Sequence, residues 1–519
     1  MRNQAFISLC VFIFALFLAW NLGGKIAVSD MNSIAFVALA FVAVGVAVKI
    51  LSNWRLGFYS FLIWLLFEDL VRKYLGNNMA IYFAKDVLVG LTYIALLIDI
   101  RRGRATTFRP PFRLFFYLFL WLAFIQIFNS NSPSIVYGLM GAKMYFYYAP
   151  LMFVSYALIR NDEDLRKFLA VNAALAGVIS SLGIAQAILG HSFLNPTKLA
   201  PDLRELGALD KVTPITNQIL TLPTAVFVST GRFAYYLIVA FIVVMGTTGY
   251  LLLYSRRSRK LVYVALGLVL GATLFSGTRG AVVYVTASAL VLAVGFLWGA
   301  PWRWRQAHKM VKAVRRAFIV GSLGLAALLL LFPDQAGSRL AFYTETLSPS
   351  SSAYEGRTRG WAYPMRQLEQ AFTNENWVLG NGTGTASLGG QYVVRLTGAA
   401  PINVWVEEGY GILIIEMGIL APFLWLLWTG ALVIAGWRVV RPLRETRLFP
   451  IGFAILWYAF LLLFPLTFGG MVPYQNFVTN AYLWLLVGVL FRLPDLLAQQ
   501  PDRAIVGARE DAKRGGLQF

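Results

Sequence analysis

Three arginines and a pair of glutamates are the residues of this sequence best suited to chemistry on a phosphorylated substrate. Arg279 lies in a short polar turn, 276–280, between two apolar runs, and Arg357 and Arg359 lie close together further along the chain. An arginine guanidinium offers a planar fork of donors that matches phosphate and diphosphate oxygens. We therefore interpret these arginines as ligands for an anionic group.

Each arginine also has a structural interpretation. An arginine within hydrophobic sequence is costly unless it is paired, so Arg279 could equally snorkel or form a structural ion pair. Arg357 and Arg359 could be solvated loop residues paired with Glu355, and for this segment taken alone that is the better interpretation.

Glu407 and Glu408 supply carboxylates just before a long apolar run, and Tyr410 follows them. Adjacent carboxylates raise one another's pKa, and partial burial adds to the effect. A carboxylate with a raised pKa is a candidate general base. The alternative is a structural tie to a nearby arginine. Glu416, two turns deeper, is expected to make helix–helix hydrogen bonds instead.

The composition places these residues in a membrane protein. Of 519 residues, 58% are hydrophobic and only 13% are charged, with a mean hydropathy of +0.65. Soluble domains carry roughly 25% charged residues. A chain of this length cannot bury so much apolar surface in its own core, so lipid must solvate much of it. A net charge of +21 on a soluble protein would indicate nucleic acid, but here the basic residues lie between apolar runs.

The sequence offers little for metal or redox chemistry. There are two histidines and a single cysteine, Cys10. A zinc site built on several histidines and an intramolecular disulfide are both excluded. We therefore expect no metal and no cofactor.

The hydropathy pattern predicts an all-α, polytopic integral membrane protein with about 14 transmembrane helices. The predicted spans are 5–22, 33–51, 56–71, 79–99, 113–128, 144–159, 167–189, 233–254, 261–276, 280–298, 317–332, 404–436, 449–468 and 475–491. Spans 1–11 occupy 1–332 and include an outer loop at about 190–232. A large extracytoplasmic loop follows at 333–403, then spans 12–14 within 404–491 and a tail at 492–519.

Basic clusters give the orientation. They lie at 101–113, 160–167, 256–260, 303–316, 438–447 and 492–514. All fall on one side under a single assignment, so we predict that both termini are cytoplasmic. The two long segments on the other side are rich in Pro, Gly, Ser, Thr and Asn. The second contains a predicted short amphipathic helix near 361–372 and a glycine-rich stretch, 380–385, interpreted as a flexible turn.

This orientation gathers Arg279, Arg357, Arg359 and Glu407 at one membrane face, although they lie far apart in the sequence. Basic clamps and a carboxylate base beside an apolar groove suit transfer from a lipid-linked diphosphate. The arginines would hold the diphosphate as it leaves. Glu407 would take the proton from the attacking hydroxyl.

Three segments resemble the O-antigen ligase and O-antigen polymerase (Wzy-type) superfamily of bacterial membrane glycan transferases. Residues 276–281, Ser-Gly-Thr-Arg-Gly-Ala, are similar to the family's Ser-x-x-Arg-Gly-Ala turn. Residues 359–361, Arg-Gly-Trp, followed by 377–382, Trp-Val-Leu-Gly-Asn-Gly, resemble its outer-loop pattern. Residues 408–420 resemble its His-Asn-x-Tyr-Leu…Glu-x-Gly helix. The likeness is strongest over about 260–425. Ligases of the family carry a histidine at the start of the last motif, where this chain has Glu407.

The resemblance implies a metal-independent glycosyltransferase in the bacterial inner membrane, for O-antigen or exopolysaccharide assembly. It would polymerise undecaprenyl-diphosphate-linked glycan repeat units at the outer leaflet. Catalytic roles are expected for Glu407 and Arg279, and substrate contacts for Arg279, Arg357, Arg359, Glu408 and Tyr410. Partners would be the lipid-linked glycan and membrane lipid, with a chain-length regulator as an optional third and no nucleic acid. The alternatives are a ligase that transfers the glycan to lipid A core or another acceptor, and a lipid or solute transporter.

Overall fold

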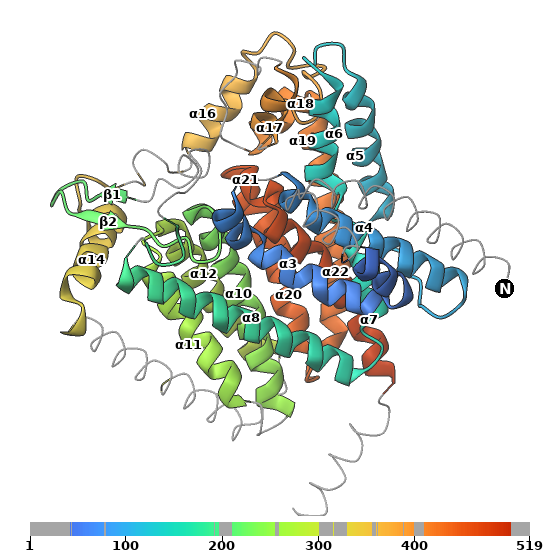
Figure 1. Ribbon diagram of the computed structural model, residues 1–519, viewed down its shortest axis with the longest axis horizontal. Coiled ribbons are helices and arrows are strands. Elements are labelled where there is room, and N and C mark those ends of the chain that lie inside the picture. Colours follow the sequence, from blue (N-terminus) through green and yellow to red (C-terminus); the bar gives the residue numbers. More distant parts are fainter. Residues whose placement is uncertain are drawn as a thin grey trace, which may run out of the picture. The chain divides into compact units, whose positions relative to one another are not determined.

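The protein is described by a computed structural model (Figure 1). The described residues are 42, 44–76, 79–190, 192–196, 210–254, 259–299, 315, 330–354, 356, 360, 362–387, 389–398 and 409–499. The predicted span 5–22 lies outside them, as do the first half of 33–51 and nearly all of 317–332.

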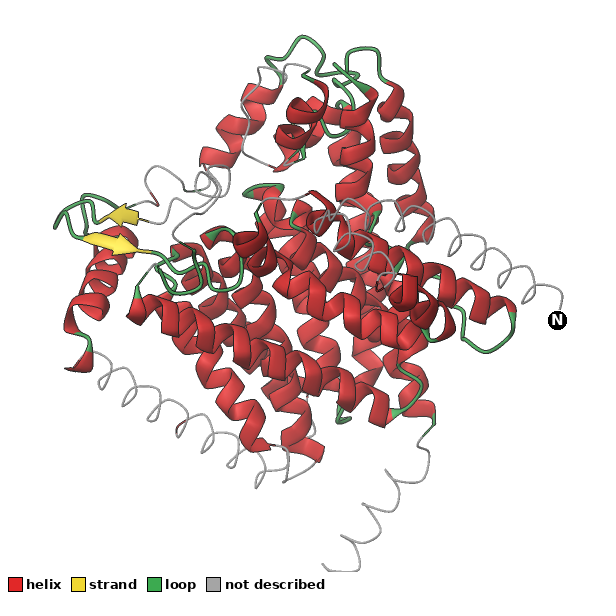
Figure 2. Ribbon diagram, viewed as in Figure 1, coloured by secondary structure: helices red, strands yellow, loops and turns green. Residues whose placement is uncertain are grey.

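Nearly all regular structure in these ranges is helical (Figure 2). The longer helices are α3 (Trp54–Leu75), α4 (Met79–Arg101), α8 (Asp162–Leu189), α10 (Thr230–Tyr254), α11 (Arg259–Phe275), α12 (Arg279–Gly299), α19 (Leu420–Val440) and α22 (Phe477–Ala498). The shorter ones are α5 (Arg113–Ile125), α6 (Ile135–Phe146), α7 (Leu151–Leu158), α14 (Pro333–Leu347), α16 (Ala362–Ala371), α17 (Gly390–Thr397), α18 (Gly409–Met417), α20 (Phe449–Leu461) and α21 (Val472–Gln475). The 3-10 turns η1 (Gln126–Phe128) and η2 (Arg441–Leu443) follow α5 and α19, and a π-helical turn, η3 (Leu462–Leu466), continues α20.

Seven helices in the described part are long and apolar enough to cross a membrane. They occupy Met79–Arg101, Asp162–Leu189, Thr230–Leu253, Arg279–Gly299, Leu420–Leu443, Phe449–Leu466 and Phe477–Ala498. These seven helices support the prediction of a membrane protein, whereas the total of about 14 spans stays a prediction. The helix expected near 361–372 is confirmed as α16.

Two predicted spans differ from the observed helices. The span 144–159 is divided between α6 and α7, and Pro150 caps the second helix. The span 404–436 is divided between α18 and α19, because Gly418 has a φ of +80°. A side chain at Gly418 would overlap the carbonyl oxygen of Val378, so a close backbone approach accompanies the break. The predicted all-α class also omitted one antiparallel hairpin, in which β1 (Asp210–Val212) pairs with β2 (Ile219–Thr221).

The chain forms two compact units. The smaller comprises Met1–Trp64 with Phe83–Ala105, and the larger comprises Leu65–Tyr82 with Thr106–Phe519. In the smaller unit the indole nitrogen of Trp54 donates to Asp99, at 3.1 Å, and Arg104 forms an ion pair with the same carboxylate. A side-chain carbon at Gly57 would lie 2.6 Å from both Ile50 and Thr92, so glycine permits this close packing.

The core of the larger unit is built on α22, which is buried along most of its length. Aromatic rings fill the space around it. Trp484 stacks on Trp428 with ring centroids 5.9 Å apart, and the Phe116 ring meets Trp484 edge-on at 5.2 Å. Such offset and edge-to-face pairs add to the dispersion energy of this core.

The glycine-rich stretch 380–385 is buried rather than flexible, so its interpretation as a flexible turn was wrong. Gly380, Gly382 and Gly384 have φ values of +79°, +102° and +85°, which favour glycine. Polar side-chain and main-chain groups in the stretch form hydrogen bonds with neighbouring helices. Thr383 donates from its hydroxyl to the Ala123 carbonyl at 2.8 Å, and the Asn381 N–H donates to the Ile415 carbonyl at 2.8 Å. We call residues 380–385 the glycine loop.

Gly384→Ala is expected to lower the free energy of unfolding by about 3 kcal/mol, through backbone strain and overpacking. The new methyl group would overlap the Tyr137 carbonyl oxygen and would also lie within 2.8 Å of the Gly141 backbone. Thermal unfolding in detergent micelles would measure the loss. Gly389→Ala is the matched control, because its methyl group would meet nothing closer than 3.4 Å. Equal unfolding temperatures for the two variants would contradict a rigid glycine loop.

Candidate functional site

Of the predicted site residues, the structure describes Arg279 and Tyr410. Arg357, Arg359, Glu407 and Glu408 lie outside the described residues, so their roles stay predictions. The two described residues occur at opposite ends of a continuous series of contacts within the larger unit.

Arg279 is the first residue of α12, after the turn that ends α11. Its guanidinium carbon lies 5.2 Å from the ring centroid of Phe342 on α14, within the range of a cation–π contact. Gly277 in the turn has a φ of +64°, and a side chain there would overlap Leu222. The Ser276–Arg279 region is therefore packed against α14 and the segment that follows β2.

Arg339 on α14 fixes this packing and was missed by the sequence analysis. Its guanidinium donates to the carbonyls of Phe275 at 2.9 Å, Thr221 at 3.1 Å and Ala187 at 3.5 Å. Two of these carbonyls lie in the last turns of α11 and α8, where the helix dipole favours a cation. Burial lowers the Arg339 pKa to about 10, so the side chain remains protonated at neutral pH. A lone arginine after a predicted span carries no sequence signal for this role.

A largely buried loop, 222–229, joins β2 to α10 and contacts α3 and α8. Gln186 on α8 accepts hydrogen bonds from the main-chain N–H groups of Thr224 and Ala225, at 2.8 and 2.7 Å. The Lys73 ammonium on α3 donates to the Thr224 hydroxyl and the Ala225 carbonyl, each at 2.9 Å. The side chains of Gln186 and Lys73 thus form hydrogen bonds with backbone N–H and C=O groups that water cannot reach in this buried loop.

Asp69 is the centre of the next group of contacts. It accepts hydrogen bonds from Arg232 at 2.7 and 2.9 Å, from Arg72 at 3.1 Å and from the Val228 N–H at 3.3 Å. Arg72 also lies 3.5 Å from Glu68. Glu68, Asp69 and Arg72 are almost completely inaccessible to solvent. A buried carboxylate needs this degree of pairing, because leaving it unpaired would cost several kcal/mol.

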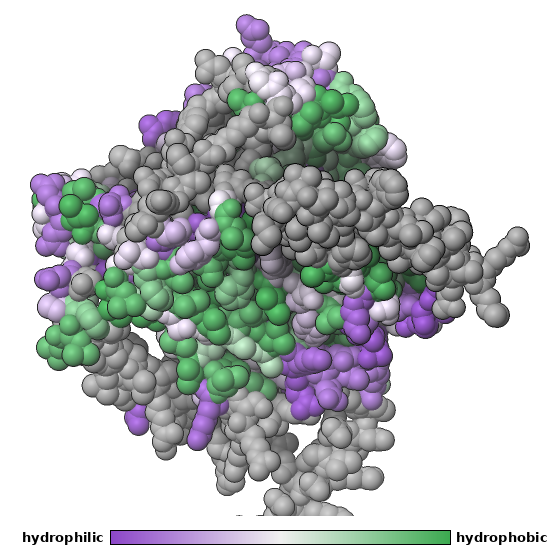
Figure 3. Space-filling model, in the orientation of Figure 1, coloured by the Kyte–Doolittle hydropathy of each residue, from purple (hydrophilic) through white to green (hydrophobic). Residues whose placement is uncertain are grey.

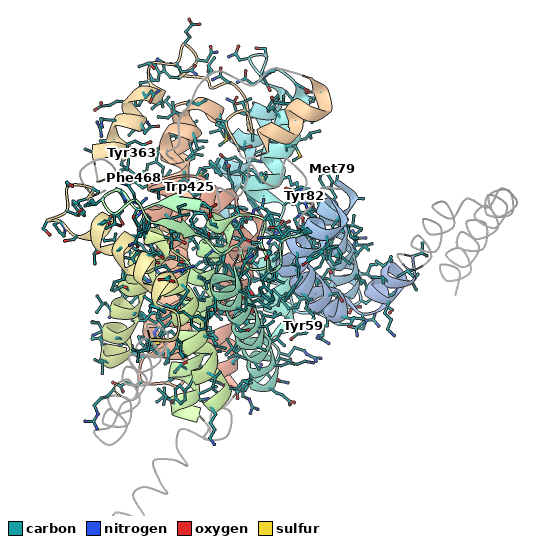
Figure 4. The ribbon with its side chains drawn as sticks, turned by 60° about the vertical axis from the view of Figure 1, so that its left-hand side comes forward. Tyr59, Met79, Tyr82, Tyr363, Trp425 and Phe468 are labelled. Carbon is teal, nitrogen blue, oxygen red and sulfur yellow. The ribbon has the colours of Figure 1, made fainter. Side chains whose placement is uncertain are left out.

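Aromatic rings cover the cations of this group. Tyr82, labelled in Figure 4, lies 5.1 Å from the Arg72 guanidinium carbon and 4.6 Å from the Lys143 ammonium. Arg232 lies 4.6 Å from the ring centroid of Phe477, at the start of α22. The rings of Tyr82 and Phe477 meet edge-on.

We call this group the cation-rich cluster. Its members are Glu68, Asp69, Arg72, Lys73, Lys143 and Arg232. Four of the six are basic side chains and two are carboxylates. Burial lowers the pKa of Lys73 to about 7, so its ammonium is only partly protonated at neutral pH. Most lie near helix ends that the predicted orientation places outside: the last turns of α3 and the first turn of α10. The cluster therefore gathers several basic side chains near the helix ends that are predicted to lie outside.

Glu416 on α18 forms the next group. Its carboxylate accepts hydrogen bonds from the Tyr145 hydroxyl on α6, at 2.8 Å, and from the Ala386 N–H, at 3.1 Å. Gln475 in turn donates to the Tyr145 hydroxyl at 3.3 Å, two residues before Phe477 of the previous group. The expected helix–helix hydrogen bond of Glu416 is confirmed. Sequence reasoning gave no sign that Glu416 also holds the backbone just beyond the glycine loop.

Burial raises the pKa of Glu416 to about 7, although the hydrogen bonds from Tyr145 and Ala386 oppose the rise. The nine residues of α18 are too few to cross a bilayer, which needs about 20. Tyr410, one turn and a half before Glu416 on α18, places its ring 5.6 Å from Phe468. The series of contacts that begins at Arg279 ends here.

The described part of the chain holds no group of three or more His, Cys, Asp or Glu side chains placed to bind a metal ion. In comparisons with known proteins, the chain matches no family model, no curated protein and no solved structure. The resemblance to the O-antigen ligase and polymerase superfamily therefore stays a prediction.

The raised pKa of Glu416 predicts a stability that falls with pH. The folded protein releases this proton at about pH 7, whereas the unfolded chain does so near 4.5. The folded state thus holds more protons between these values, and its stability declines as the pH rises through this window. The unfolding temperature of the wild type minus that of Glu416→Gln should fall from pH 4.5 to 7 and then level off. A difference that is constant with pH would contradict the shift.

Proposed function

We propose that this chain is a membrane glycosyltransferase that polymerises glycan repeat units linked to undecaprenyl diphosphate at the outer leaflet of the bacterial inner membrane. The observation that best supports the proposal is the cation-rich cluster, in which Arg72 and Arg232 converge on Asp69 beside Lys73. The order of the three sequence motifs supports the choice of substrate class.

Basic side chains gathered at a predicted membrane face favour an anionic ligand. The diphosphate of a lipid-linked sugar is such a ligand, and its polyprenyl chain can remain in the bilayer beside the helices. Arginine and lysine side chains that already balance Asp69 and Glu68 are held in position before substrate arrives. Preorganised cations stabilise a leaving diphosphate more strongly than water does, because they need no reorganisation during the reaction.

In the proposed reaction, a sugar hydroxyl of one repeat unit attacks the anomeric carbon of a second, lipid-linked glycan. A glycosidic bond forms as the bond from that carbon to the diphosphate oxygen breaks. Glu407 takes the proton of the hydroxyl, and undecaprenyl diphosphate leaves with the bonding electrons. Arg279, Arg357 and Arg359 remain the arginines expected to contact the diphosphate, and the cation-rich cluster adds to their field.

The reaction type can be tested with membranes that contain the protein and a short lipid-linked repeat unit, followed by gel separation of the products. A ladder of lipid-linked oligomers is the expected result. A single transfer to an added lipid A core acceptor would indicate the ligase instead. Movement of the substrate across the bilayer without a new glycosidic bond would exclude both transferases and favour the transporter.

Arg279→Ala and Glu407→Gln should each abolish the ladder without lowering the amount of protein in the membrane. The first removes a guanidinium from the proposed diphosphate contact, and the second removes the base. Immunoblots of the same membranes provide the control for expression. Undiminished product from either variant would remove that residue from the proposed site.

Arg232→Gln should reduce kcat/KM for the lipid-linked donor about tenfold or more, because a charge-assisted contact contributes about 1.5–3 kcal/mol. Arg232→Lys should retain more activity, since it keeps the charge. Arg366→Gln is the matched control, because Arg366 is an exposed arginine on α16. Thermal unfolding of all three variants would separate a loss of binding from a loss of stability. Equal effects of Arg232→Gln and Arg366→Gln would contradict a role for the cluster.

A further inference from the structure

The glycine loop packs between α5 and α6. Just before the loop, the Leu379 carbonyl accepts a hydrogen bond from Gln126, at 2.7 Å, and Gln126 directly follows α5. Four residues later, the Thr383 hydroxyl donates a hydrogen bond to the Ala123 carbonyl. Gly384 then lies against Gly141, six residues into α6. Successive residues of the loop therefore contact positions progressively further from the turn that joins α5 to α6.

The apolar helix made by α5 and η1 is short for a membrane span. It covers Arg113–Phe128, which is 16 residues. At a rise of 1.5 Å per residue it is about 24 Å long, whereas the hydrocarbon core of a bilayer is about 30 Å thick. With Arg113 at one edge of the hydrocarbon, Phe128 reaches no further than the opposite edge. The glycine loop contacts Ala123, five residues before Phe128, and would therefore lie within the hydrocarbon layer.

Exposed apolar side chains continue from this helix onto the segment that precedes the glycine loop. On the helix they are Trp121, Phe124, Ile125 and Phe128, with exposed fractions from 47 to 65%. Trp377, Val378 and Leu379 follow, at 36, 50 and 69%. Figure 3 shows hydrophobic surface over α5. The Val378 carbonyl accepts from the Ile419 N–H at 3.3 Å, and Ile419, Leu420 and Phe423 extend the exposed apolar set onto α19.

We infer that residues 377–385 form a re-entrant segment, in which Trp377, Val378 and Leu379 insert into the lipid of the leaflet at that end and the glycine loop lies at membrane depth. This goes beyond the proposed function and does not depend on it.

Two observations make lipid the occupant of this surface. The apolar side chains are continuous with the outer face of a helix whose length and composition suit hydrocarbon, and a tryptophan lies at the level of its end, as in the aromatic belts of membrane proteins. Non-helical backbone is tolerated at membrane depth only where protein buries it. The glycine loop meets this condition, because it is buried and its backbone is bonded to Gln126, Ile415 and Glu416.

The single cysteine of the chain makes the inference simple to test. In a Cys10→Ser background, a nitroxide spin label would be attached at Val378→Cys and, separately, at Leu379→Cys. The full-length protein would be reconstituted into vesicles of phosphatidylethanolamine and phosphatidylglycerol. Electron paramagnetic resonance then compares collision of the label with oxygen, which partitions into hydrocarbon, and with a water-soluble nickel chelate.

Phe128→Cys and Glu375→Cys are the reference positions, because both residues are exposed. Position 128 is expected on the hydrocarbon side of the boundary between lipid and water, and position 375 on the water side. The oxygen-to-nickel ratio at 378 and 379 should match that at 128 and exceed that at 375 several-fold. Ratios equal to that at 375 would place the segment in water and overturn the inference. Low accessibility to both reagents would also overturn it, since a protein partner would then cover the surface. Because Val378 and Leu379 are exposed, their replacement removes little packing, and the unfolding temperature of each labelled variant checks the fold.

Discussion

Asp69 is the carboxylate that joins the charged interior of the larger unit. Two arginines from different helices, α3 and α10, bond to it, and the N–H of Val228 places the buried loop 222–229 beside it. In a low-dielectric interior such a group is stable only when every partner is present. Asp69 therefore links the start of α10 to the end of α3. The aromatic rings of Tyr82 and Phe477, which cover the cations, depend on it in turn.

The same requirement, that buried polar groups be satisfied, recurs at the two other junctions of the site. Arg339 satisfies carbonyls from two helix ends and a strand, and Glu416 satisfies a hydroxyl and the backbone next to the glycine loop. Each side chain ties together segments that are far apart in the sequence. The proposed diphosphate contacts would be built on this rigid frame, which suits a reaction whose main demand is the stabilisation of a charged leaving group.

The sequence predicted those helices that can be recognised from the pattern of apolar residues within one continuous segment. Continuous apolar runs identified α4 and α10 to within a few residues, and helical spacing identified α16. It did not predict the break at Gly418, because a single glycine in an apolar run is compatible with a continuous helix, and the break accompanies the approach of Val378 from another segment. The cation-rich cluster was missed for a similar reason. Charged residues flank most membrane spans, and only the tertiary structure shows that Glu68, Asp69 and Arg72 are buried. The buried glycine loop likewise depends on α5 and α6, which no local pattern reveals.

The charges near the end of α3 also bear on how the protein is made. With Glu68, Asp69, Arg72 and Lys73 in its last two turns, α3 is not among the helices apolar enough to cross a membrane on composition alone. Its principal counter-ion partner, Arg232, is synthesised 163 residues after Asp69. At a translation rate of about 5–20 residues per second, that interval is roughly 8–33 s. During this time the nascent helix must be shielded by the insertion machinery or remain at the bilayer surface, so stable integration of α3 is expected to be a late event of biogenesis that follows the arrival of α10.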